Sequence, residues 1–82
     1  MNKHIELVEK WLADPLSVSQ AELKANYNAA ALAYTYDANA ATIATENASY
    51  YASLATANCT HATAAAKWVA EYHSLIKEQD NE

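Results

Sequence analysis

The hydrophobic positions near the start of the chain predict a short amphipathic helix. Ile5, Val8 and Leu12 recur at steps of three and four residues, which places them on one side of a helix. Pro15 follows closely, and the residue before a proline is pushed out of the helical region. The pattern therefore predicts a helix over residues 3–13.

A second helix is predicted to begin directly after this break. Ser19 and Glu22 have the spacing of a capping box, in which a serine caps the helix and an acidic residue three positions later bonds back. Ser17 begins a competing version of the same motif. Because no glycine or proline occurs from there to residue 79, the sequence predicts helix throughout 17–79, as one long helix or as a helical hairpin.

A stripe of mostly apolar residues runs through this second region without losing its phase. A weak 11-residue sequence repeat follows the same stripe. Eleven residues make about three helical turns, so equivalent residues of the repeat line up along a helix. A hairpin need not keep its phase across a turn, so the pattern favours one long helix. The repeat places Leu32, Ile43, Leu54, Ala65 and Ile76 at equivalent positions. The stripe consists of Ala25, Ala29, Leu32, Tyr36, Asn39, Ile43, Asn47, Tyr50, Leu54, Ala57, His61, Ala65, Trp68, Tyr72 and Leu75.

The predicted fold class is all-α, a short helix followed by a long Ala/Tyr-rich helix that packs in a helical oligomer. A helix of roughly 60 residues is about 90 Å long, so the short first helix cannot cover its stripe and other copies of the chain would have to do so. The alternative is a compact three-helix bundle with a break near 45–49 or 56–60, where Asn47 or Asn58 could end a helix in place of glycine.

Composition narrows the class of protein. The 82 residues form a single domain, 1–82, with a net charge of −5, five lysines and no arginine, so direct nucleic-acid binding is not expected. No apolar run is long enough for a membrane span or resembles a signal peptide, and a lone cysteine fits a reducing compartment. We therefore expect a cytoplasmic protein.

The middle of the chain is almost free of charge. Residues 25–66 contain only Asp37 and Glu46 as charged side chains, between many small residues and tyrosines. Small residues let helices approach closely, and tyrosine buries a ring while its hydroxyl keeps a partner. We expect interface or binding residues at Leu32, Tyr36, Ile43, Tyr50, Leu54, His61, Trp68 and Tyr72, and partner-facing tyrosines off the stripe at Tyr27, Tyr34 and Tyr51.

No catalytic, metal or cofactor site is predicted. His4, His61 and His73 share no metal-ligand spacing with one another or with Cys59. Cys59 and His61 point about 200° apart on a helix, so they cannot act together as nucleophile and base. The aromatic residues are expected to pack in a core or an interface. The alternative is that they line a nucleotide-binding cleft between helices, with tyrosines stacked on the base.

Two segments carry a resemblance to a known group. The sequence HIELVEKWLADPLSVSQAELKANYNAA at 4–30 and the closing motif WVAEYHSL at 68–75 resemble those of short accessory proteins of tailed enterobacterial phages. This group pairs such ends with an Ala/Tyr/Asp-rich helix and carries no catalytic motif. The resemblance implies a phage gene expressed in the host cytoplasm, often of the host-takeover or anti-defence kind.

Three functions follow as hypotheses. The first is a non-enzymatic protein that binds and inhibits a host protein, such as an antiviral defence factor. The second is a sponge that sequesters a nucleotide immune messenger, with lysines in place of the missing arginines for phosphate recognition. The third is a self-assembling structural helix without a ligand.

Overall fold

The computed structural model describes residues 2–54 and 59–80, and every regular element in these ranges is a helix. The elements are α1 (Lys3–Ala13), the single 3-10 turn η1 (Pro15–Ser17), α2 (Gln20–Tyr36), α3 (Ala40–Leu54) and α4 (Cys59–Asp80). The Cα radius of gyration is 12.0 Å, close to the ~12 Å expected of a compact domain of this length. The predicted all-α class is confirmed. None of the helices described is long and apolar enough to cross a membrane.

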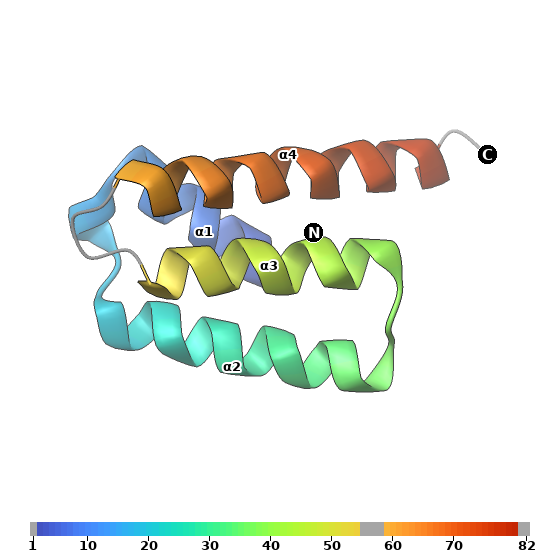
Figure 1. Ribbon diagram of the computed structural model, residues 1–82, viewed down its shortest axis with the longest axis horizontal. Coiled ribbons are helices and arrows are strands. Elements are labelled where there is room, and N and C mark those ends of the chain that lie inside the picture. The colour runs from blue at the N-terminus through green and yellow to red at the C-terminus, as the bar shows by residue number, and fades with distance from the viewer. Residues whose placement is uncertain (1, 55–58, 81–82) are drawn as a thin grey trace.

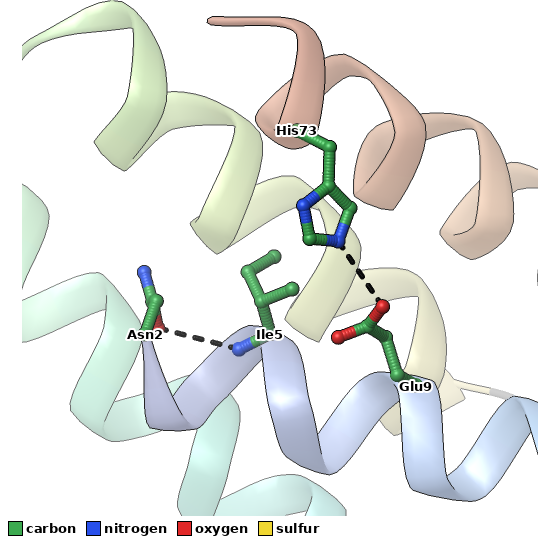
Figure 2. Close-up of polar contacts among 4 residues, drawn as sticks. All are labelled: Asn2, Ile5, Glu9 and His73. Atoms are coloured by element: carbon green, nitrogen blue, oxygen red, sulfur yellow. Dashed lines mark hydrogen bonds and ion pairs between the residues drawn. The ribbon is translucent and has the colours of Figure 1, made fainter. Parts of the chain in front are cut away.

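Helix α1 begins and ends where the sequence predicted. The Asn2 side chain caps it by accepting hydrogen bonds from the backbone N–H groups of His4 (2.8 Å) and Ile5 (3.3 Å), the second of which is drawn in Figure 2. Asp14 has an extended backbone and begins the turn into η1, with Pro15 at its first position. The predicted boundaries 3–13 are thus confirmed.

Helix α2 begins with the predicted capping box. The Ser19 hydroxyl accepts from the Glu22 backbone N–H at 3.1 Å, and the Glu22 carboxylate accepts from the Ser19 backbone N–H at 3.2 Å. The first helical residue is therefore Gln20, and the competing start at Ser17 belongs to η1 instead.

The predicted continuous helix over 17–79 is wrong, because the chain breaks at residues 37–39. Asp37 leaves the helical conformation, with φ −146° and ψ 81°, and Asn39 donates its backbone N–H to the Asp37 carbonyl at 3.0 Å. The Asn39 side chain then accepts from the Thr42 backbone N–H at 2.9 Å. Asp and Asn side chains offer the backbone such alternatives to a helix, and no glycine is needed for the turn.

The sequence also predicted possible helix breaks near 45–49 and 56–60. Helix α3 runs without interruption through 45–49, so the break predicted there is wrong. The break predicted at 56–60 falls mainly on residues 55–58, which lie outside the described ranges, and α4 begins at Cys59.

The three longer helices form a layer, and α1 crosses one face of it. Helices α2, α3 and α4 lie side by side in alternating directions, with α3 in the middle (Figure 1). Helix α1 contacts all three, whereas α2 and α4 do not touch each other in the described parts. The arrangement is therefore not a closed triangle of three helices. It is a layer that has one covered and one uncovered face.

Small side chains build the covered side of the central helix. On α3 the buried positions are all Ala, Ser or Thr, whereas Ile43, Tyr50 and Leu54 are about 40% exposed and Tyr51 packs partly buried against the core. A helix with neighbours on three sides needs small residues, because the side chains at a contact set the distance between helix axes. The core cluster consists of Ile5, Val8, Trp11, Val18, Leu23, Ala44, Ala48, Ala52, Ala65, Val69 and Tyr72.

A polar network centred on Asn26 holds α1 against this layer. The Asn26 amide nitrogen donates to the His4 carbonyl at 3.1 Å and to the Ser49 hydroxyl at 3.3 Å. Its side-chain oxygen therefore accepts from the His4 Nδ1–H, at 2.8 Å. Asn26 is 9% exposed and Ser49 is fully buried. One side chain thus joins α1, α2 and α3. A second bond, from the Asn2 amide to the Thr45 hydroxyl at 3.0 Å, adds to the attachment.

Replacing Asn26 with Ala should lower the free energy of unfolding by about 2–3 kcal/mol, because buried partners on two helices lose their hydrogen bonds. Urea denaturation measures the change. The matched control is Asn28→Ala on the same helix, where the exposed asparagine forms no hydrogen bond within the described ranges, and a shift within about 0.5 kcal/mol is expected. Equal effects of the two substitutions would contradict the role of the network.

Candidate functional site: the open face of the helix layer

The uncovered side of α3 carries three of its large side chains. Ile43, Tyr50 and Leu54 are 39–40% exposed, and steps of seven and four residues place them on one side of the helix. Thr45 and Ser49, which bond to α1 and α2, are buried on the other side. The exposed apolar side chains therefore lie on the face of the layer that α1 does not cover.

Helix α2 extends this surface from one side. The rings of Tyr27 and Tyr50 are in contact, with centroids 5.4 Å apart and a tilt of 58°. Tyr34 follows Tyr27 by two turns of α2. Ile43 precedes Tyr50 by two turns of α3. Since α2 and α3 are antiparallel, Tyr34 and Ile43 fall at the same level of the layer. We call the surface formed by Tyr27, Tyr34, Ile43, Tyr50 and Leu54 the open face.

Aromatic contacts continue from the open face towards α4. Tyr50 meets Tyr51 edge to face with ring centroids at 5.4 Å, and Tyr51 stacks on His61 at 6.3 Å and 27°. Tyr27, Tyr51 and His61 are half-buried. Four rings from three helices therefore form one chain across the layer, and all four were among the residues singled out in the sequence.

The remaining predicted residues lie elsewhere. Leu32 and Tyr36 are 58% and 83% exposed on the part of α2 that points away from the core. Trp68 is half-buried against the core cluster, and Tyr72 belongs to it. The expected stripe is thus split, since its α2 and α3 parts face outwards while its α4 part packs inside the same chain.

Glu46 is the charged side chain closest to the open face along α3. It lies three residues from Ile43 and four from Tyr50, so all three share one side of the helix. Glu46 is half-buried, and the described residues supply neither a hydrogen bond nor an ion pair to its carboxylate. Covering this carboxylate without a partner would be costly. From the sequence, Glu46 is recognisable only as one of two charges in 25–66, and its place on the surface depends on the packing of the helices.

A second feature missed from the sequence is a pocket at the end of the layer where α2 turns into α3. It has a volume of about 260 Å³ and is lined by Asn2, His4, Ala33, Asn39, Ala41, Thr42, Thr45, Tyr72 and Ile76. These residues come from all four helices and the 37–39 turn. No spacing along the sequence brings them together, so only the packing of the helices could show this pocket.

A hydrogen bond between side chains joins α1 to α4. His73 Nε2 lies 3.1 Å from a Glu9 carboxylate oxygen, as Figure 2 shows, and both side chains are more than a third exposed. Such a pair contributes at most about 1 kcal/mol. In the described ranges no three His, Cys, Asp or Glu side chains gather closely enough to hold a metal ion.

Comparison with known proteins adds no relative. Neither the models of protein families, nor the curated proteins, nor the solved structures give a match to this chain. The open face and the pocket therefore have to be interpreted from their own residues.

The contact between Tyr27 and Tyr50 should be measurable as a coupling. In a double-mutant cycle with Tyr27→Ala and Tyr50→Ala, we expect a coupling free energy of about 0.5–1.5 kcal/mol, as for other aromatic pairs. Chemical denaturation of the four proteins gives the value. Tyr27→Ala combined with Tyr36→Ala is the control, because these residues are nine positions apart on one helix and should act additively. A Tyr27–Tyr50 coupling no larger than this control would refute the contact.

Proposed function

We propose that this chain is a non-enzymatic binding protein that inhibits another protein by docking onto it with the open face. The observation that carries the proposal is the one-sided cover of the helix layer. Helix α1 protects one face, whereas the other face keeps Ile43, Tyr50 and Leu54 about 40% exposed. Exposed apolar side chains gathered on one surface are typical of interaction sites in soluble proteins.

The chemistry of the open face suits a protein partner. Tyrosine combines a large apolar ring with a hydroxyl and is enriched among the residues that dominate binding energy. Three tyrosines lie on the open face, and two of them already touch each other, so less side-chain freedom is lost on binding. A partner of matching chemistry would offer apolar side chains together with one cation or hydrogen-bond donor for Glu46.

The resemblance of residues 4–30 and 68–75 to phage accessory proteins supports the choice of target. We propose that the molecule bound and inhibited is a host protein in the bacterial cytoplasm, such as an antiviral defence factor. The open face would act by covering a functional surface of that target, without chemistry by the chain itself.

Self-assembly is the second candidate, because the same surface could be covered by another copy. Two open faces would meet with the two Glu46 carboxylates as the charges that α3 contributes, and these would have to stay in contact with water at the edge of the interface. An assembly of this kind would occupy the surface needed for a host target. The two functions therefore predict different native masses in the absence of a target.

Changing Tyr50 to Ala should weaken target binding by about 30-fold or more while the chain stays folded, because Tyr50 lies at the centre of the open face. The assay is affinity capture from infected host cells with the tagged chain, followed by titration against the recovered protein. Tyr36→Ala is the matched control, since Tyr36 is the more exposed tyrosine but lies outside the open face. It should bind as the unchanged chain does.

Two results would overturn the proposal. One is equal binding by the Tyr50→Ala and Tyr36→Ala proteins, which would place the interface elsewhere. The other is a stable homo-oligomer at micromolar concentration that captures no host protein, and sedimentation of the purified chain would reveal it. That second result would favour the structural self-assembly.

A further inference from the structure

The pocket beside the 37–39 turn is independent of the open face and has its own polar groups. It lies where the first residues of α1, the start of α3 and the last turns of α4 come together. Its walls include the apolar side chains of Ala33, Ala41 and Ile76. At about 260 Å³ it is slightly smaller than most small-molecule sites, which suits a ligand with one ring rather than a large cofactor.

Tyr72 supplies the pocket with a polar group that the fold itself does not use. The residue is only 8% exposed, yet its hydroxyl forms no hydrogen bond with any part of the chain described. Among the described residues, His61 Nδ1 is the one side-chain nitrogen or oxygen that is fully buried and has no hydrogen-bond partner. The Tyr72 hydroxyl also lacks a partner, so it cannot be fully buried. Because Tyr72 lines the pocket, we infer that its hydroxyl opens into it.

His4 and Asn39 add an acceptor and a donor. The His4 Nδ1–H donates to Asn26, so in the neutral ring Nε2 is left as an acceptor. The Asn39 side-chain oxygen accepts from the Thr42 backbone N–H and hydroxyl, so its amide nitrogen remains a donor. Both residues line the pocket, whereas no lysine, aspartate or glutamate does.

We propose that this pocket binds a small uncharged planar group that carries a hydrogen-bond donor beside an acceptor. The donor would bond to His4 Nε2, and the acceptor would receive the Tyr72 hydroxyl or the Asn39 amide. Primary carboxamides and the edges of nucleobases share this chemistry. Charged groups such as carboxylates and phosphates are disfavoured, since no lysine lines the pocket to balance them. The proposal does not depend on the function of the open face.

Three probes separate the possible sources of this group. Benzamide presents a carboxamide on an apolar ring, adenine presents a nucleobase edge, and benzoate replaces the amide of benzamide with a carboxylate of the same size. Titration of each probe into the isotope-labelled full chain, followed by amide NMR shifts, reports both site and affinity. We expect saturable shifts around the pocket with a Kd on the order of 1 mM for a ligand of this size.

Two substitutions test the polar groups while keeping the fold. Tyr72→Phe removes only the hydroxyl and should weaken binding about 10-fold, as for one lost hydrogen bond. Asn39→Asp keeps the side-chain oxygen that caps α3 but removes the amide donor. The negative charge that it introduces should also oppose binding of benzoate. Tyr34→Phe is the control, because Tyr34 lies on α2 outside the pocket lining and should leave the Kd unchanged.

The outcomes are distinct. Binding of adenine alone identifies a nucleobase ligand, and binding of benzamide alone or of both probes identifies the shared amide-like chemistry. The proposal is overturned if neither probe saturates at several millimolar, if benzoate binds as well as benzamide, or if Tyr72→Phe has the affinity of the unchanged chain. Loss of binding at the open face in the experiment on Tyr50 would not alter any of these results.

Discussion

The arrangement of this small protein depends on the attachment of α1 to one face of the helix layer, and Asn26 is the centre of that attachment. Its amide bonds to α1 and to α3 from a buried position on α2. A buried amide without hydrogen-bond partners would be destabilising. The network therefore stabilises only the arrangement in which Asn26 reaches its partners on both other helices. The covered face, the open face and the pocket at the end of the layer all follow from this placement of α1.

The open face is a consequence of the amino acids that fill the covered one. Helix α3 packs closely against its neighbours through Ala44, Ala48 and Ala52, which leaves Ile43, Tyr50 and Leu54 on the uncovered side. Close packing explains why α3 buries its small residues, but leaving Ile43, Tyr50 and Leu54 partly exposed adds nothing to the stability of the isolated chain. This inversion is the physical reason for proposing a binding role, and it suits a protein partner better than bulk water.

The sequence predicted the local structure well and the packing poorly. The spacing of hydrophobic residues and Pro15 gave the range of α1, and the capping box at Ser19 gave the start of α2, because those signals act within a few residues. The stripe from Ala25 to Leu75 was misleading, since the 37–39 turn keeps the phase of the pattern and exposed tyrosines resemble buried ones by periodicity alone. Tyr27, Tyr50, Tyr51 and His61 were all singled out in advance, but their contact needed the antiparallel pairing of α2 with α3. The pocket could not be predicted, because its residues come from five segments that only tertiary packing unites.

A single chain covers one face of its helix layer and leaves the other face to solvent. Photochemically induced nuclear polarisation of tyrosine rings, measured by NMR on a dilute sample of the monomer, tests this claim directly. One-sided cover of the layer predicts strong signals from Tyr36 and Tyr50 and none from Tyr72. A silent Tyr50 at every concentration, or a Tyr72 as strongly polarised as Tyr50, would contradict it.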